Sequence, residues 1–259
     1  MELPRACGIV ALLTDFGLDD PFVGVMKGVI KQKNLRADVI DFCHGVPAHA
    51  VSVGALYLAA AIGRFPPGTV HVAVVDPGVG TARRALAACA AGCFWLAPDN
   101  GLLEPILRRD DAEVRELDME KLRLEAASRT FHGRDVFAPV AGLLSGGRFG
   151  FRAVGDRCEA PVRLVGDPLA SDAAPRVIAV DRFGNLITNV TAARVGHERW
   201  SGIKVGARSI ALRGTYADVP AGEALALINS YDLLEIAIHQ GRAADVLRIP
   251  VGTPLEALK

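Results

Sequence analysis

The most constraining feature of this 259-residue chain is an alternation, over its first 165 residues, of short apolar runs with longer helix-like segments. The apolar runs have strand length and predict buried strands over residues 8–14, 37–42 and 69–75. Helices are predicted over residues 22–32, 51–62 and 136–144. Residues 86–96 are typical of a hairpin turned at Ala91-Gly92. Buried strands that alternate with helices favour an α/β fold, with a mostly parallel sheet flanked by helices.

The pattern changes after Phe151, and from Arg176 onward the segments are short and strand-like. Glycines separate them, and strands are predicted over residues 177–180, 186–190, 209–212, 224–228 and 233–237. Short strands at this spacing are typical of a small barrel or sandwich. We therefore predict an α/β domain over residues 1–165, a linker over 166–175, and a smaller C-terminal all-β barrel domain over 176–259.

Composition argues against several classes of protein. The 29 Lys and Arg residues are balanced by 29 Asp and Glu, whereas a nucleic-acid surface needs an excess of basic side chains to meet backbone phosphates. The longest stretches free of both charged residues and histidine hold 14 residues, fewer than the roughly 20 that a membrane-spanning helix needs. Five scattered cysteines are expected to be free thiols in a reducing cytosol, and no signal peptide is recognisable. We expect a cytoplasmic protein that binds neither nucleic acid nor membrane.

Polar and glycine-rich clusters follow three of the predicted strands. They occupy residues 14–17, 76–81 and 98–101, and a fourth cluster covers residues 132–135. Because ligands of open α/β sheets bind at the carboxyl ends of the strands, these loops are expected to share one crevice. A tight turn is the alternative interpretation of each loop by itself, since Asp, Asn and Gly favour turns for local reasons.

One set of side chains in these loops is chemically coherent. Asp76 and Arg83 stand on either side of a glycine-rich turn, and His132 precedes a predicted helix. A carboxylate, a guanidinium and an imidazole can together hold and orient one water molecule. The alternative is a structural salt bridge between Asp76 and Arg83 beside a capping histidine.

Other site types have weaker support. Neither a phosphate-binding loop nor a nucleophile-elbow serine motif is present. A catalytic metal would have to be held by acidic residues and one histidine, namely Asp15, Asp19, Asp20, Asp76, Asp99 and His132. The chain has no HExxH motif and no spaced histidine pair, so we expect no metal site.

The sequence resembles a known family, the S-adenosyl-L-methionine hydroxide adenosyltransferases, which are hydrolytic relatives of fluorinase and chlorinase. The matching motifs occur in the family's order, at residues 14–17, 20–28, 44–47, 65–81, 98–103, 131–135, 181–189 and 229–237. The resemblance implies an N-terminal α/β domain followed by a C-terminal β-barrel. It also implies a homotrimer whose active sites lie between one subunit's N-terminal domain and its neighbour's C-terminal domain.

The reaction that the resemblance implies is hydrolysis of S-adenosyl-L-methionine. Hydroxide derived from water attacks the ribose C5′, giving adenosine and L-methionine without a metal or organic cofactor. The family's residue roles map onto this chain as water-handling Asp76, Arg83 and His132, ribose-binding Asp15, adenine-binding Phe183 and Asn185, and methionine-binding Asp20, Asp181 and Ser230. Tyr231 stands where fluorinase-like members carry Arg beside the methionine carboxylate.

Three alternatives stay open at the level of sequence. The first is halide transfer to form a 5′-halo-adenosine, although halogenating relatives lose the Asp–Arg–His water site that this chain retains. The second is a nucleoside-binding protein with little turnover. The third is a metal-dependent hydrolase that uses the aspartate cluster.

Overall fold

The computed structural model describes residues 3–125, 128–170 and 172–259. It divides into two compact units, Met1–Val165 and Gly166–Lys259, which are described separately below. Within the described ranges, no helix is both long enough and apolar enough to cross a membrane.

The first unit is built on one mixed sheet with the strand order β2-β1-β3-β5-β4-β6. Its strands are β1 Ile9–Thr14, β2 Asp38–Cys43, β3 Val70–Val74, β4 Ala85–Ala90, β5 Cys93–Pro98 and β6 Glu113–Glu116. The first four strands in the spatial order are mutually parallel, while β4 and β6 are antiparallel to their neighbours. The predicted mostly parallel sheet is confirmed.

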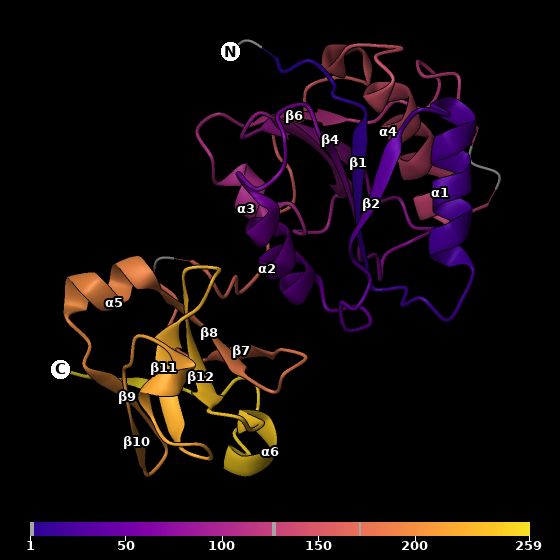
Figure 1. Ribbon diagram of the computed structural model, residues 1–259. Helices are drawn as coiled ribbons and strands as arrows, with labels where there is room; N and C mark the ends of the chain where they lie inside the picture. The colour runs from indigo at the N-terminus through magenta and orange to yellow at the C-terminus, as the bar shows by residue number, and fades with distance from the viewer. Residues whose placement is uncertain (1–2, 126–127, 171) are drawn as a thin grey trace. The chain divides into compact units, whose positions relative to one another are not determined.

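Helices cover both faces of this sheet (Figure 1). The helices of one face are α1 Phe22–Lys33 and α4 Ala138–Ser145, and those of the other are α2 Val51–Ala61 and α3 Glu104–Leu107. Side chains of β3 alternate between the two cores: Val72 packs with α1 and α4, and Ala73 packs with α2 and α3. A strand buried on both faces has to be apolar throughout, which explains the continuous apolar runs in the sequence.

The predicted hairpin is also confirmed. Strands β4 and β5 pair antiparallel up to Ala90 and Cys93, and the two residues between them, Ala91 and Gly92, have positive φ angles of 52° and 71°. Two successive positive φ angles are the mark of a tight type I′ turn, whose twist suits a hairpin. Strand β6 and helix α3 were not expected from the sequence.

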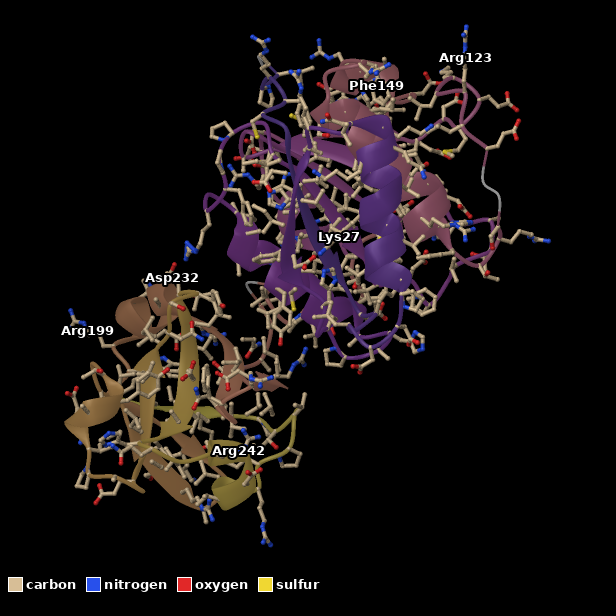
Figure 2. The ribbon with its side chains drawn as sticks, turned by 45° about the vertical axis from the view of Figure 1, so that its right-hand side comes forward. Lys27, Arg123, Phe149, Arg199, Asp232 and Arg242 are labelled. Atoms are coloured by element: carbon tan, nitrogen blue, oxygen red, sulfur yellow. The ribbon has the colours of Figure 1, made fainter. Side chains whose placement is uncertain are left out.

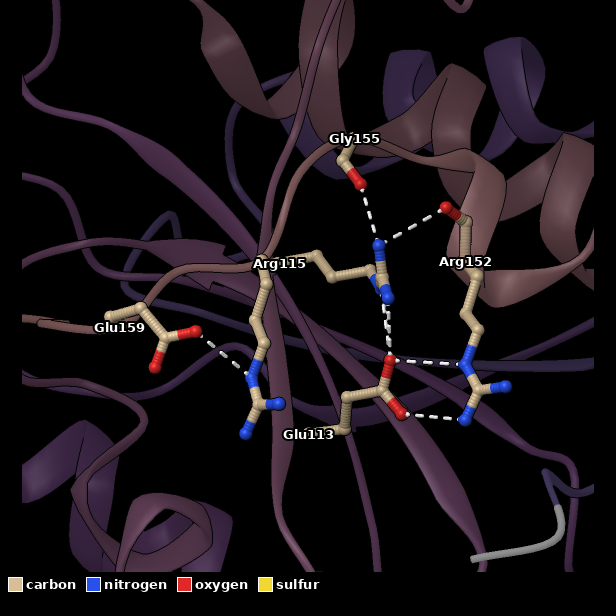
Figure 3. Close-up of polar contacts among 6 residues, drawn as sticks. Glu113, Arg115, Arg152, Gly155 and Glu159 are labelled. Atoms are coloured by element: carbon tan, nitrogen blue, oxygen red, sulfur yellow. Dashed lines mark hydrogen bonds and ion pairs between the residues drawn. The ribbon is translucent and has the colours of Figure 1, made fainter.

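The edge strand β6 is joined to the following chain by a network of charged groups (Figure 3). Glu113 accepts hydrogen bonds from Arg115 at 2.8 Å and from Arg152 at 3.1 Å, and Arg152 is the main cause of the lowered pKa of Glu113. Arg115 also donates to the carbonyl oxygen of Gly155 at 2.9 Å and lies over the Phe151 ring. These contacts hold the 3₁₀ turn Phe151–Ala153 against the sheet edge.

The second unit is a closed β-barrel. One sheet has the order β11-β12-β8-β7 and the other β10-β9-β13. Its strands are β7 Val177–Val180, β8 Leu186–Thr191, β9 Gly202–Val205, β10 Arg208–Ala211, β11 Ala224–Ile228, β12 Leu233–Ile238 and β13 Glu256–Leu258. Single bridges, Leu212 to Ala226 and Arg176 to Pro254, join the sheets at both edges. The predicted barrel is therefore confirmed.

The barrel unit is not purely β, in contrast to the expectation. It contains α5 Ala192–Glu198, α6 Ala243–Leu247 and the 3₁₀ turn Tyr216–Asp218. Helix α5 begins where the Thr191 hydroxyl accepts the backbone N–H of Arg194, an N-cap at the end of β8. Short helices at strand ends are set by such local caps and leave little trace in hydrophobic periodicity.

Candidate functional site

The polar loops of the first unit gather at one edge of its sheet. Strands β1, β3 and β5 are parallel neighbours, so the loops after Thr14, Val74 and Pro98 leave the sheet on the same side. The Asn100 side chain donates to the carbonyl oxygen of Val75 at 2.8 Å. This contact places the third loop against the beginning of the second, as expected for a shared crevice.

Asp76 and Arg83 form a two-point ion pair across the second loop. Arg83 Nε donates to Asp76 Oδ1 at 2.9 Å, and Arg83 Nη2 donates to the other carboxylate oxygen. Their side chains are only 5% and 10% exposed, so water screens this pair little. The loop can fold back because Gly80 has φ +81°, and a Cβ there would lie 2.8 Å from the Arg129 carbonyl oxygen.

His132 completes this cluster. Its Nδ1 lies 2.8 Å from Arg83 Nη2, the same nitrogen that contacts Asp76. Because a guanidinium only donates, Nδ1 is the acceptor, and the neutral ring then carries its proton on Nε2. Burial, and then the positive charge of Arg83, lower the pKa of His132 and favour this neutral form.

The helix after His132 is unusual at its start. Residues Gly133–Phe137 form a π-helical turn, in which the N–H of Ala138 bonds to the carbonyl of Gly133, before α4 continues as a regular helix. Phe137 packs under the cluster, with its ring centroid 5.8 Å from Arg83 Cζ. A Cβ at position 133 would lie 3.1 Å from Met26 Sδ, so the turn is closely packed at its first residue.

Asp15 follows β1 directly, and its carboxylate accepts the backbone N–H of His49 at 2.8 Å. Asp20 is exposed and stands next to Pro21, the residue before α1. Both acidic residues therefore lie in the loop between β1 and α1, at the sheet edge that also carries Asp76.

An aromatic cluster flanks these groups in the sequence and was missed by sequence reasoning. The rings of Phe16, Phe22 and Phe131 contact one another, with centroids 5.3 to 5.9 Å apart. Phe16 is next to Asp15 and Phe131 is next to His132, and Phe22 is 42% exposed. Their position next to charged candidate residues is the sequence signal that could have identified these rings. The cluster gives this part of the site an apolar wall.

In the second unit, Asp181, Phe183 and Asn185 occupy the turn between β7 and β8. Phe183 is 72% exposed, whereas Asn185 is buried. Gly184 has φ +84°, and a Cβ there would come within 2.8 Å of the Arg242 Cβ. Arg242, labelled beside α6 in Figure 2, also donates to the Arg182 carbonyl at 2.9 Å, so this helix start fixes the turn.

Ser230 and Tyr231 lie in a turn between β11 and β12, and Tyr231 is 55% exposed. The turn is held by Asn229, whose Oδ1 accepts the backbone N–H of Tyr231 at 2.9 Å. Asn229 in turn donates to Glu235 at 3.2 Å, and the Tyr216 hydroxyl donates to the same carboxyl group at 2.8 Å. Burial raises the pKa of Glu235. Sequence reasoning missed these supporting residues, which carried no spacing signal.

The aspartates of the metal alternative do not converge. In the described part of the chain, no three His, Cys, Asp or Glu side chains are placed to hold one metal ion. Asp99 is buried and accepts from Arg84 at 2.7 Å and from the Val162 N–H at 2.7 Å. Both of its oxygens therefore take part in hydrogen bonds that stabilise the fold.

Comparisons with known proteins identify the family. Residues 10–155 match the model of the SAM hydroxide adenosyltransferase N-terminal domain, and residues 175–256 match that of the C-terminal domain. A curated relative from Thermus thermophilus, named (R)-S-adenosyl-L-methionine hydrolase, is 38% identical over 96% of this chain and 99% of its own length. One of the same name from Salinispora arenicola is 39% identical over 95% and 96%. Proteins named fluorinase match more distantly, at 26% identity for that of Actinopolyspora mzabensis.

The fold has a close counterpart among solved structures. The crystal structure of an uncharacterized conserved protein from Thermotoga maritima matches with a TM-score of 0.87 and 35% identity, over 96% of this chain and all of that one. Both family models, relatives over nearly the full length and this structural match point the same way. The chain belongs to the SAM hydroxide adenosyltransferase family.

Proposed function

We propose that this protein hydrolyses S-adenosyl-L-methionine to adenosine and L-methionine. The observation that carries the proposal is the Arg83 guanidinium, bound on one side by Asp76 and on the other by the His132 ring. Relatives of 38% and 39% identity, named (R)-S-adenosyl-L-methionine hydrolase, support the same reaction.

The chemistry of this cluster suits a water nucleophile. As the bond from the water oxygen to C5′ forms, the bond from C5′ to sulfur breaks, and the sulfur keeps the electron pair as a neutral thioether. One water proton leaves to solvent, and no acid is needed at the leaving group. The attacking oxygen must gain hydroxide character, which a fixed positive charge stabilises.

Each member of the cluster has a distinct part in this proposal. Arg83 is always protonated, so it supplies the positive charge. Asp76 fixes the guanidinium at two points, and the neutral His132 presents its Nε2–H as a donor to the water. The two donors then orient the oxygen in line with the bond that breaks.

The remaining roles concern the substrate. We assign Asp15 to the ribose hydroxyls, Phe183 and Asn185 to adenine, and Asp20, Asp181 and Ser230 to the methionine end, with Tyr231 beside its carboxylate. The exposed face of Phe183 suits stacking on a purine. Asp15 keeps carboxylate lone pairs for a sugar, because the N–H of His49 takes up only part of what two carboxylate oxygens can accept.

We also propose a homotrimer in which each site takes its second-unit residues from a neighbouring chain, and a cytoplasmic location. Head-to-tail contacts between copies of one chain close into a ring when the rotation between neighbours is a whole fraction of a turn. Mixing an Arg83→Ala chain with an Asn185→Ala chain should then restore activity, because some sites would receive both intact halves. An active monomer in light scattering would overturn the trimer.

One product analysis tests the proposed function. The purified protein is incubated with S-adenosyl-L-methionine, with and without chloride or fluoride, and the products are separated by chromatography. We expect adenosine and methionine in both cases, with Arg83→Ala as the inactive control. A 5′-halo-adenosine would establish halide transfer, and binding without product would establish a nucleoside-binding protein. Loss of activity with a chelator would establish the metal-dependent alternative.

A further inference from the structure

We propose that His44 is a positioning residue that fixes the loop carrying Asp15 and so sets the affinity for the ribose. The inference rests on the proposed function only in assigning the ribose to Asp15. The resemblance includes His44 in a matching motif but gives it no role.

His44 contacts residues on both sides of Asp15 in the sequence. The His44 ring is buried, with its Nδ1 2.8 Å from the hydroxyl of Thr14, and its carbonyl oxygen accepts the N–H of Gly17 at 2.9 Å. The Thr14 hydroxyl oxygen also accepts the N–H of Phe16 at 3.2 Å. The residues on both sides of Asp15 are therefore tied, directly or through one hydroxyl, to a single histidine.

The other side of the ring is anchored in a neighbouring strand and helix. His44 Nε2 lies 2.9 Å from an oxygen of Asp41 in β2, and Lys27 of α1 donates to the other oxygen at 2.6 Å. Figure 2 labels Lys27 on this helix. Burial raises the pKa of Asp41, but the hydrogen bonds from Lys27 and His44 outweigh it, so the pKa is lowered and the carboxylate stays charged.

This chain of contacts has one consistent direction. An ionised Asp41 can only accept, so Nε2 of His44 carries the proton. The buried Thr14 hydroxyl needs an acceptor for its own proton, and Nδ1 of His44 is within hydrogen-bond distance, so Nδ1 accepts and the Thr14 oxygen lone pairs are left for the N–H of Phe16. Each donor meets an acceptor, and a satisfied buried network fixes one geometry.

A hydroxyl, an imidazole and a carboxylate in a row also resemble a nucleophilic triad. Thr14 is fully buried at the end of β1, and its oxygen is already an acceptor for backbone. A nucleophile must reach its substrate, so this set serves to position the loop.

The segment that follows His44 makes a second contact with the same loop. The N–H of His49 donates to the carboxylate of Asp15, and Val46, between the two histidines, is buried in the core against α2. The side chain of His44 and the backbone of His49 thus hold Asp15 from one continuous segment.

The test compares His44→Ala with His44→Asn by calorimetric titration with adenosine. Loss of the Thr14 partner should weaken adenosine binding about tenfold in the alanine variant. Asparagine can place an oxygen near the original Nδ1, so it should restore binding to within about threefold. His71→Phe is the matched control, a buried histidine of β3 that touches none of these groups, and should leave adenosine affinity unchanged.

A double variant separates positioning from general loss of stability. If His44 acts through Asp15, His44→Ala should add nothing to the loss caused by Asp15→Ala, whereas independent effects would add. Additive losses, or an alanine variant with unchanged adenosine affinity, would overturn the proposal. Should His44→Ala fail to fold, the same cycle with Asp41→Asn decides the question.

Amide hydrogen exchange gives a reading that does not depend on activity. His44→Ala should speed exchange at Phe16 and Gly17 relative to His71→Phe. If the wild-type protein neither binds adenosine nor forms it, the proposed function is refuted. Faster exchange at Phe16 and Gly17 in His44→Ala than in His71→Phe would then still show that His44 positions the loop. Equal exchange in both variants would refute the hold itself.

Discussion

Asn185 directs both of its nitrogens at Asp181: its backbone N–H donates to Oδ1 at 2.8 Å and its side-chain amide donates to Oδ2 at 3.0 Å. The family resemblance assigns these two residues to opposite ends of the substrate. The geometry couples them, because Asp181 orients the amide so that the Asn185 Oδ1 is presented as an acceptor.

This coupling predicts that Asp181→Ala weakens adenosine as well as S-adenosyl-L-methionine, by about tenfold or more for loss of a charged hydrogen-bond partner. Titration calorimetry with each ligand measures it. Ser230→Ala is the control, since it should weaken S-adenosyl-L-methionine alone. Unchanged adenosine affinity in Asp181→Ala would mean that Asp181 serves only the methionine end.

Arg83→Met should lower kcat by about 10²–10³-fold and change KM little, because in the proposed mechanism the guanidinium acts on the attacking oxygen in the transition state. Steady-state kinetics measure both constants. Arg84→Met is a matched control: Arg84 is the adjacent arginine but pairs with Asp99 and the Ala160 carbonyl. A raised KM with unchanged kcat in Arg83→Met would contradict the assigned role.

His132 should give kcat/KM an acid limb whose midpoint lies below the ordinary histidine pKa of 6.5. Burial and the charge of Arg83 lower the pKa of His132, so the neutral ring that the proposed mechanism needs persists to lower pH. The limb should disappear in His132→Gln. In Arg83→Met the His132 pKa, followed by NMR, should move upward as the repulsion is removed, and a downward shift would refute the electrostatic cause.

His71 predicts how stability depends on pH. It stacks on Trp95 with ring centroids 4.0 Å apart, and its Nε2 has no hydrogen-bond partner among the described residues. Burial lowers its pKa to about 3. As the pH falls below 6.5, this histidine therefore binds a proton in the unfolded chain but not in the folded protein.

Stability should therefore be lost progressively between pH 6.5 and about 3, at up to roughly 1.4 kcal/mol per pH unit from this group. His71→Phe should flatten the curve over that interval. Urea unfolding of both proteins across the pH range measures the difference, and parallel curves would contradict the prediction.

The sequence predicted those parts of the fold in which burial leaves a direct trace. Strands buried on both faces appear as continuous apolar runs, which is why β1, β3 and the β4–β5 hairpin were found. Strand β9 was missed because it begins with Gly202, where a Cβ would lie 2.5 Å from the Ile210 carbonyl oxygen. That glycine reflects a tertiary contact, which no local pattern encodes.

The same distinction holds for the candidate site. Asp76, Arg83 and His132 could be proposed together because their chemistry is complementary, and because Asp76 and Arg83 share one glycine-rich loop while His132 precedes a helix. His44 and Glu235 could not, since each acts through a residue that the fold alone brings close. Charged groups in loops are visible in a sequence, whereas the residues that hold them are visible only in three dimensions.

The π-helical turn Gly133–Phe137 has a consequence for comparing relatives of this protein. Such a turn accommodates one residue more than an α-helical turn, and deletion of a single residue would restore α geometry. Everything before it would then rotate about the helix axis by about 100°, which would carry the imidazole of His132 away from the Arg83 guanidinium. A homologue could therefore retain Asp76, Arg83 and His132 and still lack the proposed water site. The spacing between His132 and α4 has to match as well as the three residues.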